Sequence, residues 1–330
     1  MMALTPQAKR WIMLGVTLAA ALVLAMMLLG RGAFSGNDAL LPGFDEQVPA
    51  VARLRIAGPP GAVELARTKD GSWVLASAGN APARAEMVDQ VLDAVASAGI
   101  VAAQPKDLPA MTSGLDAGVQ VTVRDAGGKM LAALTIGKPA GDDQVYARVE
   151  GASAPVIASG LPALALEAAR WTTLRLPAIA PERIKSVRVL HADGDIAAFA
   201  RGLAGQPFQL TSGDAARANP AAIEQSARVY GDLSFTGLAS ARDISWPGAS
   251  MIFVETFDGL VVTLLAKPAG AVSQVRINAH FVAPLGLAAE AKTRGEAEAH
   301  AINDLRAYAF TLPAAQAAVL NRRGMALLRD

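Results

Sequence analysis

Three histidines are the side chains best suited to acid–base or metal chemistry in this chain. They are His191, His280 and His300, and long stretches of sequence separate them. His300 follows Glu296 by four residues on a predicted helix, but none of the three has a histidine or carboxylate partner at the spacing of a known metal site. A structural or surface role is therefore favoured over metal binding for each.

The short acidic motifs and the glycine motifs also indicate turns more than chemistry. Calcium needs more oxygen ligands at fixed spacing than Asp142-Asp143 provides, and Asp193-Gly194-Asp195 has the composition of a hairpin turn. Gly137-Lys138 lacks the upstream glycine and the following Ser or Thr of a phosphate-binding loop, and the chain contains no G-x-S-x-G motif. The sequence predicts no catalytic, cofactor-binding or metal-binding residue, no cofactor and no enzymatic activity.

Three tryptophans, Trp73, Trp171 and Trp246, are the largest side chains of the region after residue 50. Trp73 occupies the centre of an alternating segment, which is typical of a residue that anchors a core. An exposed aromatic surface for a ligand is the alternative. We expect core positions for these residues.

The composition excludes several classes of protein. The net charge of +1 over 330 residues gives no basic face for nucleic acid. The absence of cysteine excludes disulfides, thiolate metal sites, cysteine nucleophiles and the lipid-modified cysteine of a lipoprotein. With 52% hydrophobic residues, the chain can form one large core or two ordinary ones.

An apolar run near the N-terminus predicts a membrane anchor. Residues 11–29 contain no charged side chain, and nineteen residues at ~1.5 Å each span about 28 Å, close to the thickness of a bilayer core. Lys9 and Arg10 precede the run, which favours a cytoplasmic N-terminus at 1–10, a transmembrane anchor at 11–30 and a body outside the cytoplasm. A cleaved signal peptide ending near Ala33-Phe34-Ser35 is the alternative, although the apolar run is long for one.

The remainder of the chain predicts an α+β fold. Residues 31–49 are rich in glycine, proline and acidic side chains, as in a linker. A first module, 50–175, alternates as strands at 52–56, 62–67, 72–75, 119–124, 130–136, 145–149 and 156–158, with helices at 83–98 and 161–169.

A second module, 176–330, repeats this order. Strands are expected at 184–190, 196–200, 207–210, 251–257, 260–265 and 275–277, and helices at 220–233, 288–307 and 313–320. Asn219 and Pro220 have the residue types of a helix start. The sequence thus predicts a transmembrane helix followed by two similar modules, each an antiparallel sheet with helices. The tail arginines, Arg322, Arg323 and Arg329, are expected to form a solvated end.

Several short motifs resemble one bacterial family, domain of unknown function 4340. The segments are V-A-R-L-R-I, V-E-L-A-R, D-G-S-W-V-L and A-P-A-R-A-E-M-V-D-Q-V-L-D-A-V, then L-T-I-G-K, V-Y-A-R-V and N-D-L-R-A-Y-A-F-T-L-P. The matching positions are Gly71, Trp73, Pro82, Val88, Leu92, Gly137, Tyr146 and Arg148. The resemblance covers about residues 48–320.

The resemblance implies a function but no catalytic residues. Proteins of this family look like membrane-anchored extracytoplasmic components associated with ABC transporters of the gliding-motility auxiliary type. The expectation is a single-pass protein of the bacterial inner membrane with a periplasmic body. It would be a non-catalytic accessory subunit that contacts permease or ATPase subunits, and a lipid or other ligand is left open. A scaffold for an envelope assembly and an envelope hydrolase are the alternatives.

Overall fold

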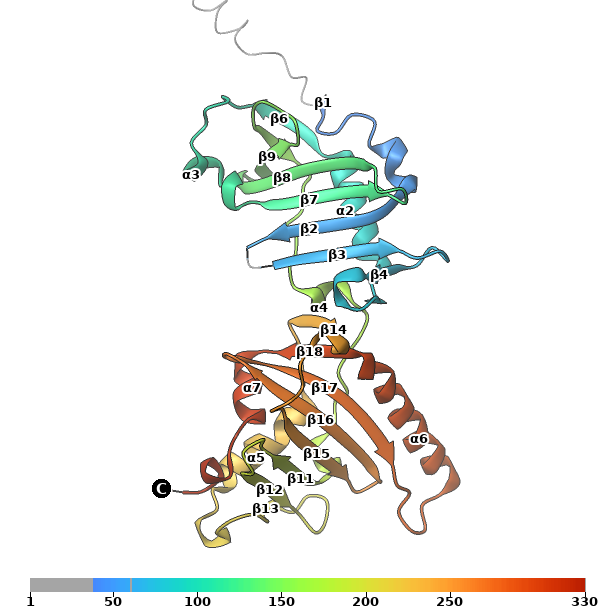
Figure 1. Cartoon of the computed structure of the whole chain (residues 1–330), viewed down its shortest axis with the longest axis vertical. Helices are drawn as coiled ribbons and strands as arrows, with labels where there is room; N and C mark the ends of the chain where they lie inside the picture. The colour runs from blue at the N-terminus through green and yellow to red at the C-terminus, as the bar shows by residue number, and fades with distance from the viewer. Residues whose placement is uncertain (1–37, 60, 330) are drawn as a thin grey trace, which may run out of the picture. The chain divides into compact units, whose positions relative to one another are not determined.

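The computed structural model describes residues 38–59 and 61–329. They form a mixed α+β fold with two antiparallel sheets, which confirms the predicted fold class at that level (Figure 1). Within these residues no helix combines the length and apolar character needed to cross a membrane. The predicted cytoplasmic segment at 1–10 and the predicted anchor at 11–30 lie outside the described residues.

The chain divides into two compact units. The first contains the described residues up to Pro59 together with Asp89–Leu164, and the second contains Pro60–Val88 together with Ala165–Asp330. Helix α2 (Ala85–Ser97) begins in the second unit and ends in the first. Each unit is described separately below.

The first unit contains seven antiparallel strands. In spatial order these are β1 (Asp38–Ala39), β6 (Gly99–Ala103), β10 (Val156–Ser159), β9 (Gln144–Val149), β8 (Met130–Gly141), β7 (Val119–Asp125) and β2 (Val51–Gly58). Short helices η1 (Asp45–Ala50), α3 (Ala110–Ser113) and η3 (Leu115–Ala117) connect them. Leu54, Ile56, Val121 and Val123 point to the inner face and are at most 1% exposed. The predicted apolar side of α2 is buried as well, with Val91, Leu92 and Val95 at most 6% exposed.

The start of the first unit differs from the expected linker. Residues 38–49, predicted as linker, instead contain β1 and most of η1, and they bury Leu40 and Phe44. Isolated apolar residues in a glycine- and proline-rich segment have no period, so their burial depends on contacts with distant parts of the chain. This segment is therefore part of the first core.

Gly137 in β8 shows why the unit requires a glycine at one point. A Cβ atom added there would lie 2.2 Å from the carbonyl oxygen of Ser113, at the end of α3. Only a residue without a side chain permits this close approach of two backbones.

The second unit contains a sheet of eight strands with helices on its inner face. The spatial order is β13 (Gln209–Leu210), β12 (Ile196–Ala200), β11 (Ile184–Leu190), β15 (Ser250–Thr256), β16 (Leu260–Ala269), β17 (Val272–Phe281), β18 (Tyr308–Leu312) and β14 (Gly237–Ser240). The unit also includes an antiparallel run of β3 (Gly61–Arg67), β4 (Trp73–Leu75) and β5 (Ala81–Pro82).

Four α-helices belong wholly to the second unit: α4 (Ala168–Trp171), α5 (Pro220–Arg228), α6 (Ala289–Asn303) and α7 (Ala314–Leu320). Its short 3-10 helices are η2 (Ala76–Ala78), η4 (Pro181–Arg183), η5 (Ala215–Arg217), η6 (Val229–Gly231), η7 (Ala241–Asp243), η8 (Asp304–Ala307) and η9 (Gly324–Leu327). Helix α5 begins as predicted, because the Asn219 side chain accepts a hydrogen bond from the Ala222 amide and Pro220 occupies the first turn.

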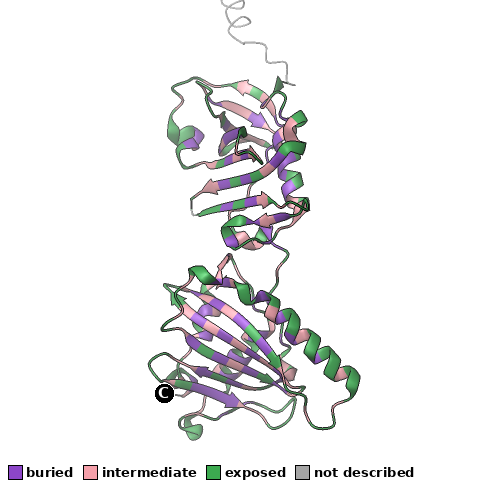
Figure 2. Cartoon of the chain, turned by 45° about the vertical axis from the view of Figure 1, so that its right-hand side comes forward, coloured by how far each residue is buried: buried purple, intermediate pink, exposed green. Residues whose placement is uncertain are grey.

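Burial alternates along the central strands of this sheet (Figure 2). Val189, Ile252, Leu264 and Ile277 form one inward row across β11, β15, β16 and β17, and they are at most 5% exposed. The neighbouring residues point to the outer face. Two-residue periodicity therefore places the core of this unit between the sheet and its helices.

Two predictions of secondary structure were wrong. The helix expected at 161–169 is absent, and only α4, at its end, is helical. Leu161 is the one buried residue of 161–169, so a helix there would have had no apolar face to pack, and short helices depend on such packing. In addition, β18 follows η8 directly, although the chain was expected to continue from helix 288–307 into a last helix without a strand.

Candidate functional site

The three histidines lie on separate elements of the second unit. His280 is exposed on β17, His300 is exposed on α6, and His191 follows the end of β11 with a side chain only 7% exposed. Among the described residues, no three His, Asp or Glu side chains lie close enough together to hold a metal ion. Of the three histidines, only His191 takes part in a buried polar arrangement.

The acidic motifs form turns, as the sequence predicts. Asp142-Asp143 connects β8 to β9 with Asp143 in the left-handed region at φ 55°, and Gly194 connects β11 to β12 at φ 90°. Two tryptophans are core residues, as expected: Trp73 is 5% exposed and Trp171 is 1% exposed. Trp246 is half-buried and donates its indole N–H to the Ala241 carbonyl at 2.9 Å.

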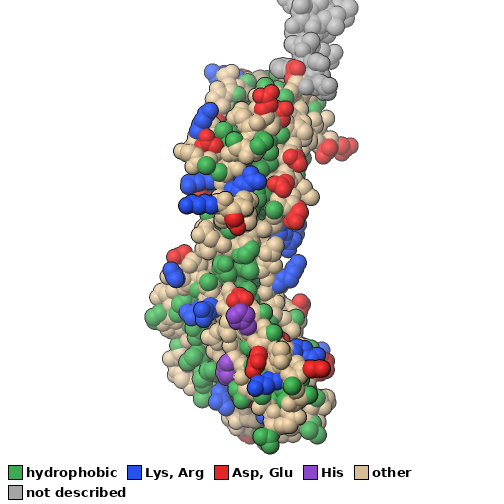
Figure 3. All heavy atoms as spheres, turned by 90° about the vertical axis from the view of Figure 1, so that its right-hand side faces the viewer, with side chains coloured by type: hydrophobic (Ala, Val, Ile, Leu, Met, Phe, Trp, Pro, Cys, Tyr) green, Lys and Arg blue, Asp and Glu red, His purple; other side chains and the backbone are tan. Residues whose placement is uncertain are grey.

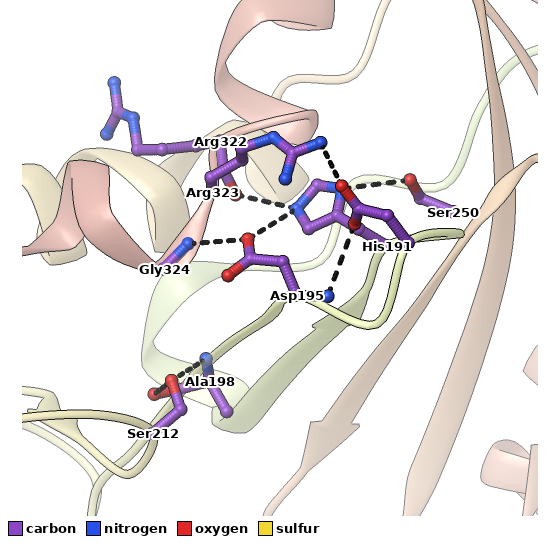
Figure 4. Close-up of polar contacts among 9 residues, drawn as sticks. His191, Asp195, Ala198, Ser212, Ser250, Arg322, Arg323 and Gly324 are labelled. Atoms are coloured by element: carbon purple, nitrogen blue, oxygen red, sulfur yellow. Dashed lines mark hydrogen bonds and ion pairs between the residues drawn. The ribbon is translucent and has the colours of Figure 1, made fainter.

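His191 contacts two segments that are distant in sequence. Its Nδ1 lies 3.1 Å from the Ser250 hydroxyl at the start of β15, and its Nε2 lies 3.2 Å from the Arg322 carbonyl (Figure 4). The carbonyl can only accept, so Nε2 carries the proton and Nδ1 accepts from the hydroxyl when the ring is neutral. The imidazole thus joins the sheet to the C-terminal segment.

The turn between β11 and β12 holds the same segment through its carboxylates. Asp195 accepts the Gly324 amide at 3.0 Å, and its nearest carboxylate oxygen is 3.9 Å from His191 Nε2. Arg323 donates to Asp193 at 2.6 Å on the exposed rim. This guanidinium is the main cause that lowers the pKa of the Asp193 carboxyl below its ordinary value.

The tail arginines were expected to be a solvated end, and this prediction was wrong for Arg322. Its guanidinium donates to the Ala222 carbonyl at 2.8 Å, to the Ser226 hydroxyl at 3.0 Å and to Gln225 at 2.8 Å. These bonds connect the C-terminal segment to α5, and the Ala222 carbonyl also accepts a hydrogen bond from the Ser226 hydroxyl at 2.8 Å. The basic tail therefore packs on the second unit.

Asn321 adds one more contact and one unsatisfied atom. Its amide nitrogen donates to the Ser273 hydroxyl at 2.7 Å, whereas its Oδ1 is buried with no hydrogen-bond partner among the described residues. A depression of about 320 Å³ lies beside it, lined by His191, Asp193, Ser250, Asn321 and Arg323, with Ala192, Gly248 and Pro268. The depression and the cluster belong to one end of the second sheet.

The geometry resembles a serine–histidine–aspartate set only in composition. In such a set one imidazole nitrogen takes the serine proton while a carboxylate accepts a hydrogen bond from the other. Here the Arg322 carbonyl is nearer to Nε2 than the Asp195 carboxylate, and Ser250 is only 5% exposed. The arrangement is suited to fastening the residues at 321–324 onto the β11–β12 turn.

Sequence reasoning identified His191 and the Asp193–Asp195 turn but not their partners. Ser250 and the segment Asn321–Gly324 carry no motif of their own. The one available signal was the Arg322-Arg323 pair, and a pair of basic residues is far more common on a solvated tail. The contacts exist because the fold brings residues about 60 and 130 positions apart to one place.

A second cluster of charged side chains in this unit pairs one arginine with two carboxylates. Arg183 donates two hydrogen bonds to Glu298 on α6, at 2.9 and 2.8 Å, and one to Asp258 at 3.0 Å. The bond to Glu298 is the main cause that raises the pKa of Arg183. Burial alone would raise the pKa of Asp258, but hydrogen bonds from Thr256 and Arg183 outweigh it and lower that pKa. This cluster connects the start of β11 to α6 and to the β15–β16 turn.

Comparison with known proteins identifies the family. A model described as domain of unknown function (DUF4340) matches residues 73–245, slightly more than half of the chain. The chain belongs to the DUF4340 family. No curated protein and no solved structure matches it.

The range matched by the DUF4340 model contains only some residues of the His191 cluster. It includes His191, Asp193 and Asp195, but it ends at residue 245, before Ser250 and the C-terminal segment. The predicted resemblance to DUF4340 is confirmed, and the matched range of 73–245 is narrower than the expected 48–320. The association with gliding-motility transporters stays a prediction.

Proposed function

We propose that this protein is a non-catalytic accessory subunit of an ABC-type envelope transport complex, held in the bacterial inner membrane by one N-terminal helix with its body in the periplasm. Membership of the DUF4340 family and the apolar run at residues 11–29 support the anchor and the location. The predicted duplication into two similar modules belongs to the same proposal.

The observation that carries the proposal is an apolar row on the outer face of the second sheet. Leu190, Ile196, Met251 and Leu265 are cross-strand neighbours on β11, β12, β15 and β16. Ile196 is 44% exposed and Met251 is 43% exposed, and the other two are half-buried. Contiguous exposed apolar side chains that cross several strands are typical of protein–protein contact sites.

The row lies on the face away from the helices that cover the core. Helices α5 and α7 lie on the inner side of this sheet (Figure 1), where Val189 and Ile252 are buried. The next row along the strands contains the polar residues Arg188, Thr263 and Asn278 together with Phe253. An apolar centre with a polar border fits an interface with a folded protein partner.

The test is a mild-detergent pull-down of the full-length protein followed by mass spectrometry. We expect stoichiometric recovery of a multi-spanning permease or an ATPase. Met251→Asp should reduce that recovery at least tenfold, because it buries an unpaired charge in the contact. Asn278→Asp is the matched control, since it adds the same charge at an exposed polar position of the same face. Recovery of the chain alone, even after crosslinking, would remove the accessory proposal.

A hydrolase is the alternative that the His191 and Ser250 contact favours. A fluorophosphonate probe labels serines that an imidazole activates. We expect no labelling, since the Ser250 hydroxyl is buried and donates to a structural imidazole. Labelling that disappears in Ser250→Ala would establish the hydrolase and refute the non-catalytic proposal.

A further inference from the structure

The outer face of the first sheet carries three arginines, Arg53, Arg124 and Arg148, for which the described residues supply no carboxylate partner. Arg53 on β2 and Arg124 on β7 are direct cross-strand neighbours, and Arg148 lies on β9 of the same sheet. Arg53 and Arg148 are exposed, and among the described residues neither side chain makes a hydrogen bond or ion pair. Figure 3 shows basic side chains gathered on one side of this unit.

Two like charges directly opposite each other on adjacent strands destabilise a sheet. The Arg53–Arg124 pair ends the regular β2–β7 register, and irregular pairing lies directly beside it. One register shift lies between Val51 and Arg53 in the β2–β7 pairing, and another lies between Val123 and Arg124 in the β7–β8 pairing. Bulges of this kind redirect side chains and are often found at functional positions. Arg124 uses one N–H to bind the Gly128 carbonyl at 2.9 Å, which leaves its other donors available.

The face is also hollowed beside Arg148. A depression of about 310 Å³ is lined by Arg148, Gln120, Thr122, Thr135 and Glu150, with neighbouring residues of β7, β8 and the turn after β9. Thr135 is the direct cross-strand neighbour of both Gln120 and Arg148. Hydroxyl, amide and guanidinium donors thus line one open concavity together with the Glu150 carboxylate at its edge, and these donors suit phosphate oxygens.

Two further side chains on this face favour a lipid surface as the source of that phosphate. Tyr146 precedes Arg148 by two residues on β9 and is half-buried, and Met130 is the cross-strand neighbour of Arg124 with 39% exposure. Arginine, tyrosine and an exposed apolar side chain together have the composition of a membrane-contacting surface. A pocket for a soluble phosphate would instead enclose its ligand.

We propose that this face binds the phosphate headgroups of anionic phospholipids. The proposal rests on the membrane anchor in the proposed function: seven residues, 31–37, separate the predicted span from Asp38. Seven extended residues reach at most about 25 Å, so the anchor holds the first unit near the bilayer surface. Each arginine at an anionic surface changes the binding ratio about fivefold, and three arginines change it on the order of a hundredfold.

The experiment uses full-length protein in liposomes, and it first tests the anchor. Flotation after alkaline washing shows whether the chain is integrated in the bilayer. Loss of the chain from the liposomes after this wash would refute the anchor, but it would leave the lipid-binding face untouched. Because the natural chain has no cysteine, Gln120→Cys accepts a single nitroxide label on the proposed face. Ser97→Cys, exposed on α2, is the matched label site away from that face. Relaxation by a nickel-chelating headgroup lipid reports contact with the bilayer surface.

We expect phosphatidylglycerol, added to phosphatidylcholine, to increase relaxation at residue 120 but not at residue 97. Combined Arg53→Gln, Arg124→Gln and Arg148→Gln substitutions should reduce the ratio of bilayer-bound to unbound protein face, measured at the residue 120 label, on the order of a hundredfold. Lysine at the same three positions should retain most of the binding, because the positive charges remain. A control that removes three exposed arginines of the second unit, Arg188→Gln, Arg228→Gln and Arg294→Gln, should leave the ratio unchanged.

Several results would overturn the proposal. These are equal relaxation in the two lipid mixtures, an equal increase at residue 97, or full contact in the triple glutamine variant. Displacement of the label from the bilayer by micromolar glycerol 3-phosphate would assign the face to a soluble phosphate ester instead. If the triple variant does not fold, salt provides the second readout. Contact of the natural face should then fall steeply as the screening length decreases below about 10 Å.

Discussion

Replacing His191 with phenylalanine tests whether the polar cluster fastens the C-terminal segment. The substitution keeps a planar ring in a site that is 7% exposed, but it removes the hydrogen bonds to the Ser250 hydroxyl and the Arg322 carbonyl. A buried polar group without a partner costs about 1–3 kcal/mol. Two groups, the Ser250 hydroxyl and the Arg322 carbonyl, lose their partner in the variant. The hydroxyl can rotate toward another acceptor, which reduces its share of the cost. We therefore expect a total loss of about 2–4 kcal/mol in the free energy of unfolding.

Urea unfolding of the full-length protein in a nonionic detergent measures this loss through tryptophan fluorescence. Hydrogen exchange at the Gly324 amide, which donates to Asp195, reports local opening of the segment and should accelerate in the variant. Ser250→Ala alone should cost about 1 kcal/mol, and adding it to His191→Phe should cost almost nothing more, because the contact has already been lost.

His280→Phe is the matched control, since that histidine is exposed on β17. It should change the free energy of unfolding by no more than about 0.5 kcal/mol. A loss for His191→Phe as small as that of the control, with unchanged exchange at Gly324, would refute the fastening role.

Three other substitutions test separate parts of the structure. Gly137→Ala should destabilise the first unit by about 1–3 kcal/mol, because its Cβ would meet the Ser113 carbonyl at 2.2 Å; Gly61→Ala, with open space around it, is the control in thermal unfolding. Arg53→Gln should stabilise the protein by about 0.5 kcal/mol at low ionic strength, measured by urea titration, and a loss of stability would contradict unrelieved repulsion from Arg124. The lowered pKa of Asp193 contributes stability that is present above the ordinary aspartate pKa of about 3.9 and is lost as the pH falls through the folded value. Asp193→Asn should therefore flatten the acid limb of a melting-temperature profile, and an unchanged limb would count against the Arg323 contact.

Local patterns in the sequence were sufficient for most elements of regular structure. Alternation predicted β2, β3, β7 and β11, because a strand with one buried face must repeat every two residues. The ten-residue β17 was predicted only at 275–277, and β8 only at 130–136. The start of α5 followed from Asn219 and Pro220 in the same way, since a helix cap depends only on neighbouring residues. Shorter strands such as β14 contain too few residues for a period to emerge.

By itself, the sequence determined the α+β class, the family and the absence of cysteine chemistry, because composition and local periodicity contain that information. Only the tertiary structure decided which distant residues meet. The contact of His191 with Arg322 joins positions 131 residues apart, and Arg53 faces Arg124 only because β2 pairs with β7 in one particular register. Register and long-range docking are set by the combined packing of many side chains, so no short segment encodes them.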